Sequence, residues 1–168
     1  ITLVGSNVVN VFSVNGADLA NAYQLAIQAP ENASVLVNVR GPGPFNFVNM
    51  GTFLTGGITA DHVMFNFPDA VPPMNGQPGS TMTIEGVQFL GSILAPNVSV
   101  SFPQGLLIGQ MFAASLEGGG QTNLMLFDAC LPIPPCIPAC DVGYQCLSRE
   151  CVDVDECEDD TNDCSENA

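Results

Sequence analysis

The sequence predicts an all-β fold, with a β-solenoid or β-helix as the first choice and a β-sandwich as the second, followed by a disulfide-rich C-terminal tail. Short segments of alternating apolar residues recur between Gly, Pro and Asn over residues 1–129, a spacing typical of sandwiches, barrels and solenoids. From Thr81 onward these segments also contain many small residues. All seven cysteines lie between Cys130 and Cys164, which separates the chain into two parts.

The first part holds the predicted strands. β-Branched and aromatic residues alternate with polar ones in several short runs, which predicts extended backbone. These runs are residues 8–14, 23–29, 34–39, 62–67, 81–84 and 98–102. Residues 106–116 form a longer apolar run, and residues 18–22 are expected to form a helical turn. Turns are predicted where Gly, Pro and Asn cluster, at residues 41–44, 72–73, 75–76 and 118–120.

A rhythm in the second half of this part favours the solenoid. Residues 86–95, 97–105 and 109–118 each combine a turn residue with an apolar strand, so we expect stacked rungs of about ten residues. Small side chains would let neighbouring coils approach closely, and they are Gly91, Ser92, Ala95, Gly109, Ala113, Ala114 and Ser115. A solenoid explains this pattern better than a sandwich, because each rung repeats one cross-section.

Most phenylalanines are expected to pack in the core rather than to form a surface for stacking a ligand. The set consists of Phe45, Phe47, Phe53, Phe65, Phe67, Phe89, Phe102, Phe112 and Phe127.

The charge pattern excludes two classes of partner. The chain has no Lys, and its two cations are Arg40 and Arg149. Nucleic-acid binding requires clustered Lys and Arg that displace counterions from phosphates, and attraction to an anionic membrane requires the same side chains. Neither partner is therefore expected. Eight of the 17 acidic residues fall within residues 153–168, a run that repels itself unless a cation neutralises it.

The cysteine density predicts a secreted protein, located outside the cell or on its surface, because disulfides form in oxidising compartments. No apolar run approaches the ~20 residues that span a membrane, so membrane insertion is not expected. The chain begins at Ile1 without Met, and we expect a mature, processed or partial chain. Two Asn-x-Ser sequons, at Asn32 and Asn97, are candidate glycosylation sites.

No catalytic residue is predicted. His62 is the single His, and a catalytic base needs a nucleophile and an orienting acid around it. Neither a Gly-x-Ser-x-Gly elbow, nor a His-Glu-x-x-His motif, nor a Gly-rich phosphate loop is present in the sequence. Asp69 and Glu85 are two carboxylates of the kind used in glycoside hydrolysis, but nothing in the sequence aligns them. We expect a protein that is not an enzyme.

Four groups of residues within the first part resemble the choice-of-anchor A family of surface domains. They are residues 11–19, residues 29–39, the Phe65-Asn66-Phe67-Pro68 segment within residues 63–70, and residues 91–116. The block Gly91-Ser92-Ile93-Leu94-Ala95-Pro96-Asn97 is the most specific of them. Together they span most of residues 1–127, and the resemblance implies a surface location.

The closing half also resembles, more distantly, the β-solenoid of microbial ice-binding proteins. Thr81-Met82-Thr83 is similar to one copy of the Thr-x-Thr ladders of ice binders. Because one copy does not make a flat ordered array, ice binding is not expected.

The tail resembles the opening of a calcium-binding EGF-like domain, through the motif Asp153-Val154-Asp155-Glu156-Cys157. The resemblance implies that Ca²⁺ is bound by the side chains of Asp153 and Glu156 and by the backbone carbonyl of Val154. Hard oxygen donors of this kind suit Ca²⁺. Only two of the six cysteines of such a domain follow, so we expect that the native protein continues beyond residue 168. A zinc site is disfavoured, because the cysteines lack paired Cys-x2-Cys units.

The domains expected are residues 1–129, a Cys-rich module at 130–152, and the start of the EGF-like domain at 153–168, with a Pro-rich connector at 131–135. In the Cys-rich module we expect the bridges Cys136–Cys146 and Cys140–Cys151, although four cysteines allow three pairings. The partners of Cys130, Cys157 and Cys164 are left open.

These observations favour a non-catalytic extracellular structural protein, a surface, filament or coat-forming subunit with a calcium-stiffened tail. The absence of Lys removes a usual guard against edge-to-edge pairing of strands, which supports self-association. The alternative is an adhesin domain displayed on a stalk that binds a glycan or a matrix protein. A third hypothesis, from another class, is a hydrolase of extracellular polymers.

Overall fold

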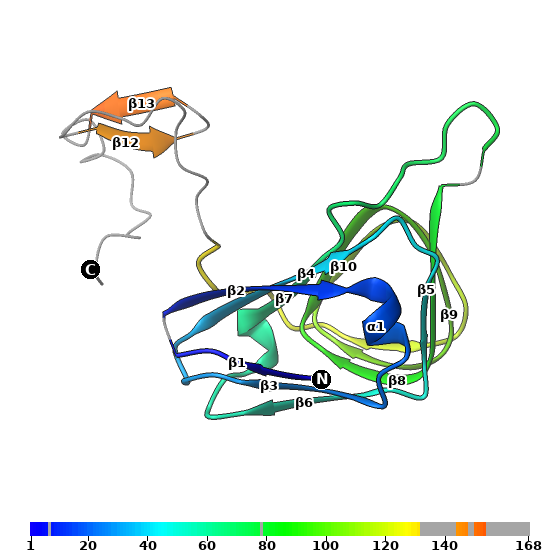
Figure 1. Ribbon diagram of the computed structural model, residues 1–168, viewed down its shortest axis with the longest axis horizontal. Helices are drawn as coiled ribbons and strands as arrows, with labels where there is room; N and C mark the ends of the chain where they lie inside the picture. Colours follow the sequence, from blue (N-terminus) through cyan, green and yellow to red (C-terminus); the bar gives the residue numbers. More distant parts are fainter. Residues whose placement is uncertain (7, 78, 132–143, 148–149, 154–168) are drawn as a thin grey trace. The chain divides into compact units, whose positions relative to one another are not determined.

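Figure 1 shows the computed structural model of the chain, in which residues 1–6, 8–77, 79–131, 144–147 and 150–153 are described, the last two ranges by their backbone alone. The chain divides into two compact units, Ile1–Leu131 and Pro132–Ala168. No helix in the described part is long and apolar enough to cross a membrane.

The first unit is a single sheet of parallel strands that winds nearly closed into a solenoid-like shape. Its strands are β1 (Thr2–Val4), β2 (Val9–Asn15), β3 (Gln24–Gln28), β4 (Ser34–Arg40), β5 (Phe45–Val48), β6 (Gly51–Thr55), β7 (Val63–Asn66), β8 (Ser80–Leu90), β9 (Ser92–Ile108), β10 (Met111–Glu117) and β11 (Gln121–Asn123). Two short helical elements interrupt them, α1 (Gly16–Ala20) and the 3-10 turn η1 (Ala60–His62). Every ladder between these strands is parallel. The prediction of an all-β solenoid-like fold is confirmed, since sandwiches are built from antiparallel strands.

One coil of the solenoid is much longer than the sequence pattern predicts. In the most regular part Ser80 pairs with Val98, and Leu90 pairs with Ile108, so a complete coil runs from Ser80 to Asn97. The expected rungs of about ten residues are therefore wrong: residues 86–95 and 97–105 follow one another around one coil, and residues 109–118 stack on parts of both, from Ile93 to Ser101. The turn residues occur at the corners of the coil, so their spacing does not report the length of a coil.

The coil has three sides, which we name A, B and C. Side A stacks β2, β4, β7, the beginning of β9 and the beginning of β10. Side B stacks β5, the first half of β8, the middle of β9 and the end of β10. Side C stacks β1, β3, β6, the second half of β8, the end of β9 and β11.

The helix α1 covers the core at the N-terminal end of side B, next to β5. Asn15 caps it, because its Oδ1 accepts a hydrogen bond of 2.8 Å from the Ala17 backbone N–H. Leu19 points inward from the helix and is fully buried. The helix lies slightly before the helical turn expected at residues 18–22.

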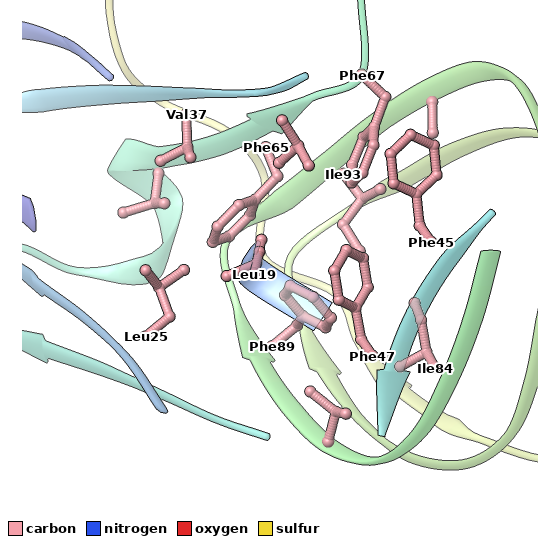
Figure 2. Packing of buried hydrophobic residues seen from close by; sticks show 14 of the residues in the cluster. Leu19, Leu25, Val37, Phe45, Phe47, Phe65, Phe67, Ile84, Phe89 and Ile93 are labelled. Carbon is pink, nitrogen blue, oxygen red and sulfur yellow. The ribbon is translucent and has the colours of Figure 1, made fainter. Parts of the chain in front are cut away.

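The core is a column of aromatic and branched side chains from all three sides (Figure 2). The rings of Phe45 and Phe67 meet edge to face with centroids 4.9 Å apart, and those of Phe65 and Phe89 do the same at 5.3 Å, a favourable geometry for aromatic pairs. Phe47 and Phe102 are buried as well. The core assignment is wrong for three of the predicted phenylalanines, since Phe53 and Phe112 are each 50% exposed and Phe127 is half-buried.

The close approach of neighbouring coils is confirmed at the corner that joins sides C and A. Gly91 and Gly109 both have positive φ, 133° and 151°, a conformation that favours glycine. A Cβ on Gly109 would lie 2.4 Å from the Gly91 carbonyl oxygen. The two corners can stack only because neither residue carries a side chain.

In the second unit, the described backbone forms one antiparallel pair, β12 (Tyr144–Leu147) and β13 (Glu150–Asp153). Their register places Cys146 opposite Cys151.

Candidate functional site

Side B carries a row of hydroxyl groups on its outer surface. Its inward positions are filled by apolar residues such as Met82 and Val100, each 1% exposed. The alternating outward positions are polar, because successive side chains of a strand point to opposite faces. The members of this hydroxyl face are Asn46, Thr81, Thr83, Ser99, Ser101, Ser115 and Glu117.

The hydroxyls are aligned in two columns that run along the stack. In the first column Thr81 pairs with Ser99, and Ser99 pairs with Ser115. In the second column Asn46, Thr83, Ser101 and Glu117 follow one another in register. Since adjacent strands of a sheet lie about 4.8 Å apart, each column presents polar groups at that interval on a stiff backbone.

Within residues 1–131, as far as the structure describes them, none of the five hydroxyls of this face has a hydrogen-bond partner. A Ser or Thr hydroxyl can donate one hydrogen bond and accept two. The face therefore offers donors and acceptors to an external ligand.

The sequence identified one Thr-x-Thr copy on this face and missed the array. Ser99-x-Ser101 lies one coil after Thr81-x-Thr83 and forms the next rung. An expected coil of about ten residues places these two segments out of register. The available signal was the hydroxyl-x-hydroxyl pattern that both segments share at the spacing of one full coil.

The two candidate glycosylation sites differ in access. Asn32 is exposed in a turn between β3 and β4. Asn97 lies within β9 and is half-buried, and its Nδ2 donates a hydrogen bond of 3.3 Å to the Ala70 carbonyl. A glycan on Asn97 has to replace that contact, so the geometry favours Asn32 of the two.

The residues weighed for catalysis have structural contacts. His62 Nδ1 lies 3.1 Å from the Ala33 carbonyl oxygen and is part-buried. Asp69 forms an ion pair with Arg40, at 3.2 Å between Oδ1 and Nη1, and its Oδ2 accepts a hydrogen bond of 3.0 Å from the Gly41 backbone N–H. Glu85 lies on side B, opposite Val48 and Gln104 in the neighbouring coils.

Most predicted residues of the tail lie outside the described part of the chain. Cys136, Cys140, Cys157 and Cys164 belong to this group, as do the calcium ligands Val154 and Glu156, while Asp153 is described only as the last backbone position of β13. Cys130 is exposed and forms no disulfide within the described residues, which also contain no cluster of three or more His, Cys, Asp or Glu side chains able to hold a metal. The disulfide and calcium assignments stay predictions.

Comparison with known proteins identifies the family of the first part of the chain. The sequence profile of the family described as "Putative Ice-binding-like adhesive domain" matches residues 1–124. No curated protein matches the chain, and no solved structure matches it either. The distant likeness to ice-binding solenoids is thereby confirmed, while the resemblances to the choice-of-anchor A family and to EGF-like domains stay predictions. With parallel coils and a profile match over 124 of its 168 residues, the chain belongs to the family of ice-binding-like adhesive domains.

Proposed function

We propose that residues 1–131 form an extracellular adhesive domain that binds the surface of a polyhydroxylated polymer, such as a polysaccharide, through the hydroxyl face. Membership in an adhesive family fits an extracellular surface or adhesin role. The observation that carries the proposal is the register of Thr81, Thr83, Ser99, Ser101 and Ser115 on one side of the coil.

A rigid row of hydroxyls suits such a ligand for a physical reason. Each hydrogen bond between neutral groups contributes only about 1 kcal/mol net, so adhesion requires several bonds at once. The strand backbone fixes the hydroxyls before binding, which reduces the entropy lost on association. The outer surface of side B carries two formal charges, on Glu117 and on Glu85 two residues after Thr83. Both are negative, so the face suits a neutral polymer better than an anionic one.

A polysaccharide is favoured over ice. The two columns contain only five hydroxyls, and the second column ends in Asn46 on one side and in Glu117 on the other. A larger and more uniform array would be needed to match a crystal plane. Measurement of thermal hysteresis separates the two ligands, since we expect none for a polysaccharide binder.

Adsorption to insoluble cellulose and chitin tests the proposal. Replacing Thr83 with Val and Ser101 with Ala removes two adjacent hydroxyls at little change in volume. The double variant is expected to lose about thirtyfold in affinity, as two hydrogen bonds of this strength imply. Thr55→Val on side C and Ser13→Ala on side A are the matched controls, since both residues are exposed. Equal adsorption of the double variant and the two controls would contradict binding through the hydroxyl face.

A second candidate is self-association into a filament or coat. At the C-terminal end of the solenoid, β10 and β11 pair only with β9 among the described strands. Leu116 stands in register with the buried Val100, yet it is 56% exposed. Unpaired edges with exposed apolar residues can accept another chain. Negative-stain microscopy distinguishes the candidates, because regular polymers support self-association and dispersed particles support the adhesin.

The proposed role is non-catalytic, and the tail contributes a calcium-stiffened, Cys-rich segment. Its support is the acidic motif Asp153-Val154-Asp155-Glu156 and the cysteines that flank it. Hydrolysis of the adsorbed polysaccharide, measured as the release of reducing ends, would instead favour the hydrolase hypothesis.

A further inference from the structure

A surface hollow of 220 Å³ lies where side B turns into side C. It is lined by Tyr23, Asn49, Met50, Gly51, Phe53, Gly86 and Gln88. These residues come from three successive coils, so the hollow exists only in the folded solenoid. It is separate from the hydroxyl face, none of whose side chains line it.

At the two glycines of the hollow, a neighbouring side chain occupies the place where a Cβ would be. In the outward column of side C, Gly51 stands between Gln24 and Gln88. A Cβ on Gly51 would lie 2.7 Å from Cε2 of Phe53, so the Phe53 ring occupies the space above this glycine. Similarly, a Cβ on Gly86 would lie 2.5 Å from Oδ1 of Asn49. The Phe53 ring and the Asn49 carboxamide therefore lie against the two glycines, and both side chains line the hollow.

Two aromatic rings are held in solvent at this hollow. Tyr23 is 86% exposed and Phe53 is 50% exposed. Phe53 points outward because its neighbour Thr52 takes the inward position, where the Thr52 hydroxyl donates to the Gln88 carbonyl. Aromatic faces gain free energy when apolar surface covers them. The exposed rings therefore provide the apolar contact that a ligand would bury.

The polar side chains that line the hollow are neutral. Asn49 and Gln88 each offer a carboxamide, which has two donors and an acceptor for hydroxyl groups, and no charged side chain lines the hollow. The chain carries a net charge of −15, which disfavours an anionic ligand. The volume is smaller than the ~300–1,000 Å³ of pockets for drug-sized molecules.

From these observations we propose that the hollow binds one neutral pyranose unit of a glycan. The C–H face of the sugar ring covers Phe53 and Tyr23, and the sugar hydroxyls exchange hydrogen bonds with Asn49 and Gln88. The site goes beyond the hydroxyl face, because it recognises a single ring from a chain end or a branch.

Titration of the full chain with cellotetraose tests this site. The protein has no Trp, and Tyr23 is one of its two tyrosines, so tyrosine emission reports directly on the hollow. A saturable change in emission is expected, together with heat of binding by calorimetry. Phe53→Ala and Gln88→Ala are each expected to weaken binding by about tenfold or more. Tyr23→Phe keeps the ring, so it should lose the change in emission and retain the heat of binding.

Phe112→Ala is the matched control, because Phe112 is also 50% exposed but lies on side A. Equal affinity of Phe53→Ala and Phe112→Ala would overturn the site, as would the absence of cellotetraose binding. Tighter binding of the anionic tetragalacturonate than of cellotetraose would contradict the proposal that the ligand is neutral. The Thr83→Val/Ser101→Ala variant should bind cellotetraose normally, so the hollow and the hydroxyl face can fail independently. Circular dichroism of each variant verifies the fold.

Discussion

Asn66 Nδ2 donates a hydrogen bond of 2.8 Å to Asn38 Oδ1 across two neighbouring coils. The two residues are partners in the β4–β7 ladder on the outer surface of side A, and both are half-buried. Ser13 continues the same column in β2. This side-chain hydrogen bond joins two neighbouring coils in addition to the backbone hydrogen bonds of the ladder.

Replacing Asn66 with Ala should destabilise the first unit by about 1 kcal/mol, the usual net contribution of a neutral hydrogen bond. Asn38→Ala should have a similar effect, and the double variant should cost little more than either single change, because both remove one shared contact. Urea unfolding followed by circular dichroism measures these differences. Asn46→Ala is the control, since Asn46 is exposed on side B. Fully additive losses would show that the two amides do not interact.

Gly109→Ala should destabilise the solenoid strongly, by about 3 kcal/mol or more, because the new Cβ collides with backbone at a positive φ. The Cβ would lie 2.4 Å from the Gly91 carbonyl oxygen. Gly119→Ala is the matched control, since its Cβ would meet only the Pro103 oxygen at 3.5 Å. Thermal unfolding compares them. Equal melting temperatures for the two variants would contradict the stacked corners.

The alternation of apolar residues was enough to predict the strands β2, β3, β4 and β7. The short strands β5 and β6 were missed, because each is only four or five residues long and lies next to clustered Gly and Pro. The predicted coil length was too short, because Gly, Pro and Asn occur at every corner of a coil and not once per coil. Phe53 was assigned to the core because hydrophobicity ranks it above Thr52, whereas the structure buries Thr52 with a hydrogen bond to the next coil.

The site was harder to predict than the fold for the same reason. The hydroxyl face needs the register between Thr83 and Ser101, and the hollow needs the register between Gly51 and Gln88. Both registers join residues from different coils. A sequence pattern shows which residues are polar or small, but the length of each coil decides which of them meet.

Reducing agent should leave the first unit folded. Residues 1–131 contain one thiol, on the exposed Cys130, and the core consists of apolar side chains without a disulfide in the described part. The melting temperature of the first unit, measured by circular dichroism with and without dithiothreitol, should therefore be unchanged. A large decrease would indicate that a disulfide involving Cys130 supports the solenoid.

Chelation of Ca²⁺ should act on the tail alone. The acidic motif that begins at Asp153 is the predicted site, and removing its ion restores repulsion between the acidic side chains. Limited proteolysis with and without EDTA should show faster cleavage within residues 150–168 and unchanged fragments from residues 1–131. Equal cleavage of the tail in both conditions would count against the calcium site.

The hydroxyl face exists only if the long coils bring the hydroxyls of separate segments into one row. Nuclear Overhauser contacts between backbone protons measure this register directly. We predict cross-strand contacts that pair Thr81 with Ser99 and Thr83 with Ser101 in parallel orientation. Contacts between segments about ten residues apart, as expected for shorter rungs, or antiparallel contacts across β8 and β9 would contradict it.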